Sequence, residues 1–139
     1  MVYCIDIIIS IKKYQVKRIV KANQSNPELP LCRLLEIQLV RAKETPAVVV
    51  VVYGNRAYED ALLELRDTAR EADFAPVAGA VFVGGHSFST EATPIARGRP
   101  DSEDLKRANG IGKVVRQRMS HIHSLEEVPF LRVPGKFPY

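Results

Sequence analysis

The sequence predicts an α/β fold in which a parallel sheet lies between layers of helices. Residues 2–11 and 47–53 are near-continuous apolar runs, as expected of strands that are buried on both faces. Segments with helical spacing of apolar residues alternate with these strands, and this alternation is typical of parallel pairing through crossovers. With 139 residues, of which 46% are apolar and 26% charged, the chain is expected to form one domain without needing a metal or a disulfide.

The first half of the chain supplies two of the expected strands. Residues 2–11 are rich in isoleucine and predict the first strand, and residues 30–43 repeat leucine at three- and four-residue spacing, which predicts a helix. Residues 47–53 contain five consecutive valines and predict the second strand.

The clearest helix is expected over residues 57–72, where Tyr58, Leu62, Leu65 and Ala69 fall on one stripe. Residues 77–83 predict a third strand, in which Gly79 would permit close packing of a neighbouring element. Residues 84–100 show no strong periodicity and are expected to form a loop.

A further helix is predicted over residues 100–119. Asp101 is a plausible N-cap with Asp104 three positions later, and the acidic first turn suits the helix dipole. Gly110 and Gly112 are expected to let this helix approach the sheet closely. Its inner stripe would comprise Leu105, Ala108, Ile111 or Gly112, Val115 and Met119. Residues 125–139 contain three prolines and predict an extended tail.

The tight turn after the valine run is the most informative place for a function. In open parallel sheets, ligands bind at the carboxyl ends of the strands. Gly54 would let the backbone approach a flat ligand, Asn55 could cap the next helix or contact a ligand, and Tyr53 and Tyr58 offer aromatic faces beside the turn. The alternative is a plain strand-to-helix turn, with Tyr58 in the core.

Four segments together carry a resemblance to a known family: TPAVVVVVYGNRAYEDALLELRD, ADFAPVAGAVFVGGHSFS, PIARGRPDSEDL and VPGKFPY. They resemble the flavodoxin-like half of the flavodoxin/ferredoxin fusion proteins of anaerobic microbes, over about residues 30–139. The resemblance implies a flavodoxin-like three-layer sandwich with a parallel sheet. It also implies FMN as the cofactor and low-potential electron transfer to or from a ferredoxin or another iron–sulfur protein.

The resemblance also implies a flavin site. The loop that flanks the isoalloxazine would be carried by Tyr53, Gly54, Asn55, Arg56 and Tyr58, and His86 and Ser87 would lie on the same rim. The phosphate loop of the family is missing, because no glycine precedes Gly54 and residues 1–29 are divergent. We therefore expect a single flavodoxin-like domain, truncated at its N-terminal side, with weak or lost FMN binding. Lys12 or Lys13, at the end of the first strand, could bind the phosphate in place of the missing loop.

Other classes of function fit less well. The net charge is +4, and no basic run is interleaved with aromatic residues, so nucleic-acid binding is not expected. The opening apolar run is too short to cross a bilayer, and Cys4 and Cys32 are expected to be buried thiols of a cytoplasmic protein. His121 and His123 have no apparent third ligand for a metal. The alternative to a redox carrier is a cofactor-free scaffold that acts in association, including homodimerisation.

Overall fold

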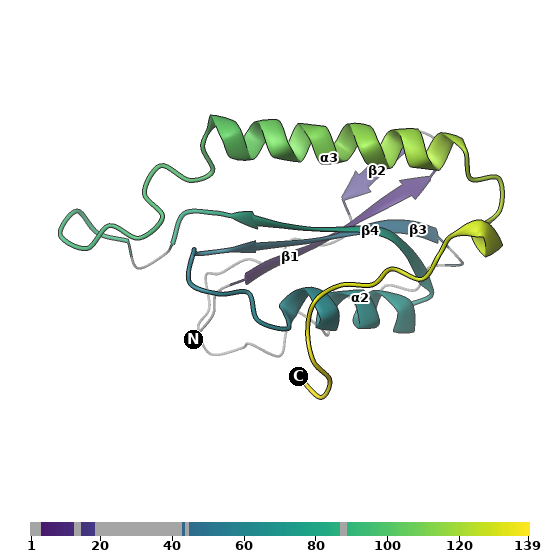
Figure 1. Cartoon of the computed structure of the whole chain (residues 1–139), viewed down its shortest axis with the longest axis horizontal. Coiled ribbons are helices and arrows are strands. Elements are labelled where there is room, and N and C mark those ends of the chain that lie inside the picture. Colours follow the sequence, from purple (N-terminus) through teal and green to yellow (C-terminus); the bar gives the residue numbers. More distant parts are fainter. Residues whose placement is uncertain (1–3, 13–14, 19–42, 44, 87–88) are drawn as a thin grey trace.

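The computed structural model of this protein describes residues 4–12, 15–18, 43, 45–86 and 89–139. In this part of the chain, a four-stranded sheet of order β2-β1-β3-β4 carries α2 on one face and α3 on the other (Figure 1). The elements are β1 (Cys4–Lys12), β2 (Gln15–Arg18), β3 (Thr45–Tyr53), α2 (Ala61–Glu71), β4 (Phe74–Val83), α3 (Ser102–Ser120) and a single 3-10 turn, η1 (Leu125–Glu127). A mixed α/β fold is therefore confirmed, whereas the helix predicted over residues 30–43 lies, apart from Lys43, outside the described residues.

The core is organised by the valine run of β3. Successive side chains of a strand point to opposite faces of the sheet. Val49 and Val51 pack toward α2, with Leu62 and Leu65, while Val48 and Val50 pack toward Val115 of α3 and toward β4. Apolar and polar residues do not alternate along this run, and the run thus correctly predicted a strand covered on both faces.

The parallel pairing predicted for the whole sheet is confirmed only between β3 and β4. β1 runs antiparallel to β3, with Cys4 opposite Tyr53 and Ser10 opposite Ala47, and β2 pairs antiparallel with β1. The predicted first strand is confirmed as β1, but its predicted parallel direction was wrong, because a continuous apolar run indicates burial on both faces and carries no information on strand direction. As a consequence, the backbone of Lys12 lies at the opposite end of the sheet from Tyr53.

Helix α2 begins four residues later than predicted. Asn55 has φ 66° and Glu59 has φ 45°, and this left-handed backbone cannot continue a right-handed helix. Asn55 therefore does not cap α2, and Asp60 at the N-cap position makes no side-chain capping bond either. Instead, Oδ1 of Asp60 accepts a hydrogen bond of 2.7 Å from the backbone N–H of Lys136 in the C-terminal tail.

Helix α3 begins as predicted, with Asp101 as N-cap and a reciprocal capping box with Asp104. The stripe of α3 that faces the sheet differs from the predicted stripe in one position. Leu105 was predicted to face inward but is 61% exposed, and the neighbouring Asp104 is buried instead. Gly110 and Gly112 do not bring the helix close to the sheet, since a Cβ on either would meet no atom within 4 Å.

The tail after η1 is extended, as predicted, and lies on the α2 face (Figure 1). Leu131 and Val133 pack against the core beneath α2, and both come within 3.6 Å of a Cβ built on Gly79. The guanidinium groups of Arg66 and Arg70 lie 4.9 and 4.7 Å from the ring centre of Phe130. Because Gly79 has no side chain, it leaves room for Leu131 and Val133 of the tail.

No helix of the described ranges is long and apolar enough to cross a membrane.

Candidate functional site at the carboxyl rim of the sheet

The carboxyl ends of the parallel strands β3 and β4 lie side by side at one end of the sheet. We call this end the rim. The N–H of Gly84, directly after β4, donates a hydrogen bond of 2.8 Å to the carbonyl of Tyr53 at the end of β3. The segment between β4 and α3 extends beyond the rim, and α3 then returns over the sheet (Figure 1). The chain therefore brings the turn after β3 and the start of α3 to the same place.

A hollow of about 260 Å³ lies at the rim. The rings of Tyr53 and Tyr58 meet edge to face beside it, with their centroids 5.5 Å apart and their planes at 67°. Apolar side chains from the end of β4 and charged side chains from the start of α3 complete its wall. The lining residues are Tyr53, Tyr58, Val81, Phe82, Val83, Arg99, Asp104, Arg107 and Ile111.

Gly54 is required at the turn because a side chain of the protein itself lies against it. A Cβ built on Gly54 would lie 2.2 Å from Cδ2 and 2.9 Å from Cγ of His86. Real Cβ atoms do not approach other atoms so closely. The imidazole of His86 therefore fills the space over Gly54 in this structure. A ligand in the hollow would contact Tyr53 and Tyr58 and not Gly54.

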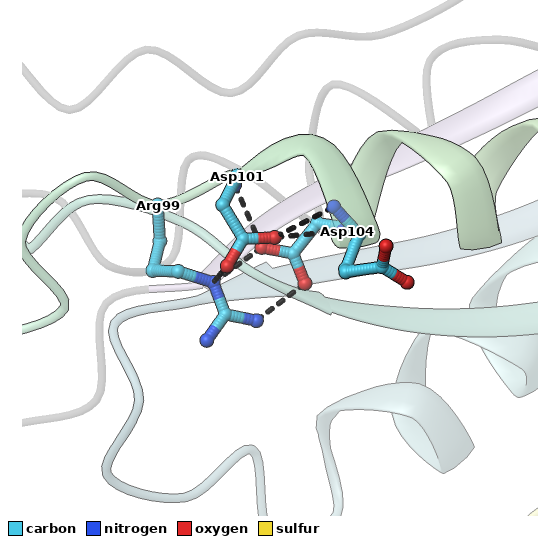
Figure 2. A network of polar contacts seen from close by, with 4 residues as sticks. Arg99, Asp101 and Asp104 are labelled. Atoms are coloured by element: carbon cyan, nitrogen blue, oxygen red, sulfur yellow. Dashed lines mark hydrogen bonds and ion pairs between the residues drawn. The ribbon is translucent and has the colours of Figure 1, made fainter.

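The start of α3 holds a carboxylate–guanidinium network (Figure 2). Arg99 donates two hydrogen bonds from Nε and Nη2 to the two carboxylate oxygens of Asp104, a bidentate arrangement. The backbone N–H of Asp101 donates a third bond to Asp104, at 2.9 Å, and Nε of Arg99 lies 3.5 Å from Oδ2 of Asp101. The bonds from Arg99, and then that from Asp101, lower the pKa of Asp104 to about 2. Asp104 thus remains a carboxylate at neutral pH.

Arg107 differs from Arg99 in having no carboxylate partner within the described part of the chain. Its side chain is exposed and lines the hollow one helical turn after Asp104. Since Arg99 and Asp104 neutralise each other, the wall of the hollow carries one uncompensated positive charge. An aromatic wall with one free guanidinium suits a planar ligand that carries negative charge.

The structure assembles some of the predicted site residues and separates others. Tyr53, Gly54, Tyr58 and His86 lie together at the rim, with Tyr53 and Tyr58 lining the hollow. Asn55 and Arg56 are exposed on the turn outside the lining. Ser87 lies outside the described residues.

Sequence reasoning missed Arg99, Asp104 and Arg107 as site residues. The sequence pattern predicts only a capping role for Asp104 and assigns no role at the site to the two arginines. One signal was available: a helix that follows a strand of a parallel sheet starts near the carboxyl edge of that sheet after the connecting loop. The segment Arg99–Arg107 could therefore have been placed at the rim.

A second hollow, of about 360 Å³, lies at the opposite end of α3 and is lined by residues that include Arg118, His121 and Glu127. Nδ1 of His121 lies 2.8 Å from the carbonyl oxygen of Gln117. The described residues contain no group of three or more histidine, cysteine, aspartate or glutamate residues arranged to hold a metal ion. This hollow lacks the aromatic wall of the rim.

Comparisons with protein-family models, with curated proteins and with solved structures find no match to this chain.

Proposed function

We propose that this chain is a cytoplasmic, flavodoxin-like module that binds FMN at the rim and exchanges electrons with a ferredoxin or another iron–sulfur protein. The observation that carries the proposal is the hollow between the Tyr53–Tyr58 pair and the start of α3, at the carboxyl ends of β3 and β4. Ligand sites of open α/β sheets lie in this position. The resemblance of the segments around Tyr53, His86 and Arg99 to flavodoxin-like domains supports the same ligand.

The residues of the rim fit the flavin ring better than the whole nucleotide. Small-molecule sites typically occupy roughly 300–1,000 Å³, and the hollow of about 260 Å³ lies just below this range, so we assign it to the ring system alone. Tyr53 and Tyr58 provide the aromatic wall, and Val81 and Val83 provide apolar contacts.

Bound FMN would supply the redox chemistry, since it carries one or two electrons, and the protein would set its potential. Tyr53 and Tyr58 would exclude water from one side of the ring. Arg107 would favour negative charge on the ligand, and Asp104, neutralised by Arg99, would not oppose it. None of the residues at the rim is required as an acid or a base for this role.

A fluorescence titration of FMN with the purified protein tests the proposal. We expect quenching at micromolar protein, and weaker binding by Tyr58→Ala because base–aromatic or ring–aromatic contacts are worth roughly 1–3 kcal/mol. Phe137→Ala is the matched control, since Phe137 is 76% exposed on the tail and does not line the hollow. A protein that neither quenches FMN nor retains colour on purification would contradict the proposal.

The second candidate is a cofactor-free scaffold that acts by association, including as a homodimer. It is favoured by the imidazole of His86, which fills the space over Gly54 where the resemblance would place part of the flavin site. It is also favoured by β4, which pairs only with β3 among the described strands and is therefore an edge of that sheet. Sedimentation that shows a monomer over a wide concentration range would contradict this candidate.

A further inference from the structure

We propose that Arg107 binds the anionic group of the ligand, so that the rim hollow selects a planar aromatic ligand with a phosphate over the same ring without one. This inference rests on the proposed function, and it names the group that replaces the missing phosphate loop. The ligand class is a ring with a phosphate on a flexible arm, for which FMN and riboflavin form a matched pair.

The charges around the hollow support this assignment. The described side chains that line it include two guanidinium groups and one carboxylate. Arg99 is held by both carboxylate oxygens of Asp104, so its hydrogen-bond donors toward that side are occupied. Arg107 is exposed, lines the hollow and has no carboxylate partner among the described residues, so its guanidinium is available to an anionic group of the ligand.

The alternative cations fit this role less well. The backbone of Lys12 lies at the far end of the sheet, because β1 is antiparallel to β3 and Cys4, not Lys12, is opposite Tyr53. Arg56 is exposed on the turn but does not line the hollow. Lys13 lies outside the described residues. A guanidinium also binds phosphate through two parallel hydrogen bonds, whereas lysine offers only a point charge.

The test compares the affinities of FMN and riboflavin by fluorescence quenching for the wild type, Arg107→Gln and Lys113→Gln. Lys113 is the matched control, because it is an exposed cation of the same helix that does not line the hollow. We expect the wild type to bind FMN roughly tenfold to a hundredfold more tightly than riboflavin, the range given by one charge-assisted contact. Arg107→Gln should remove this preference without changing riboflavin affinity, and Lys113→Gln should retain it.

Inorganic phosphate provides a second arm of the same test. Added phosphate should weaken FMN binding to the wild type but leave riboflavin binding unchanged, whereas chloride at equal ionic strength should have a smaller effect. Equal affinities of the wild type for FMN and riboflavin would overturn this inference while leaving the proposed flavin site standing. An equal loss of preference in Lys113→Gln would also overturn it, because the effect would then be one of overall charge. If the wild type binds neither compound, the proposed function and this inference both fail.

Discussion

Gly54 is the position at which the rim is most sensitive to a single methyl group. A Cβ at this position would lie 2.2, 2.9 and 3.2 Å from Cδ2, Cγ and Cβ of His86. Because the crowding includes the Cβ of His86, Gly54→Ala must displace the whole side chain and not only its tip. The positive-φ glycines of the described residues are Gly98 and Gly135, so backbone strain does not add to this cost.

The magnitude follows from these contacts. Overpacking a filled site by one methyl group typically costs about 1–3 kcal/mol of folding free energy. In a His86→Gly background the same substitution meets none of these three atoms. Replacement of glycine by alanine then stabilises the protein by about 0.4–1 kcal/mol, because the unfolded chain loses conformational freedom. The effect of Gly54→Ala should therefore differ between the two backgrounds by about 1.5–4 kcal/mol.

Urea unfolding of the wild type, both single variants and the double variant measures this difference as a double-mutant cycle. For a chain of this length, 1 kcal/mol corresponds to a shift in Tm of roughly 3–5 °C, so thermal unfolding provides an independent readout. If Gly54→Ala destabilises the protein equally with and without the imidazole, the contact between Gly54 and His86 does not explain the glycine.

Three further predictions concern stability. Leu65→Ala should cost about 2–5 kcal/mol because Leu65 is 1% exposed in the core, whereas Leu105→Ala should cost less than about 0.5 kcal/mol; equal costs in urea unfolding would contradict the placement of α3. Asp101→Ala should cost about 0.5–2 kcal/mol through loss of the N-cap, and an unchanged Tm would rule out the capping box. Asp104 has a folded-state pKa of about 2, below its ordinary value of 3.8. The contribution of Asp104 to stability is therefore present above about pH 4 and lost as the pH falls through 2. The free energy of unfolding, measured against pH, should not show this acid-dependent decrease in Asp104→Asn.

The strands and helices around the rim could be predicted from sequence because their signals are local. The unbroken run of valines places β3, the stripe of Leu62, Leu65 and Ala69 places α2, and the Asp101–Asp104 spacing places the start of α3. The direction of β1 could not be predicted in this way, because a strand that is apolar throughout can pair equally well in either direction. The choice depends on the connections and partners of the strand, which lie outside its own residues.

The residues of the candidate site also divide into those that local sequence signals predict and those that depend on distant parts of the fold. Tyr53, Gly54 and Tyr58 could be predicted because they adjoin the end of an obvious strand. The return of α3 over the sheet could have placed Arg99 and Arg107 near the rim, but which of them pairs with Asp104 and which stays unpaired among the described residues depends on side-chain packing. Leu105 was expected in the core for its apolarity, but the buried position belongs to Asp104, whose charge is compensated by the bidentate contact with Arg99.

The most direct test of a flavin site at the rim is the change in backbone amide chemical shifts of isotopically labelled protein on addition of FMN. We predict that the largest changes occur at Gly54, Tyr58, Val83 and Arg107, around the hollow of about 260 Å³. Changes confined to the neighbourhood of His121, at the other end of α3, or no changes at millimolar FMN, would contradict the assignment of the rim as the flavin site.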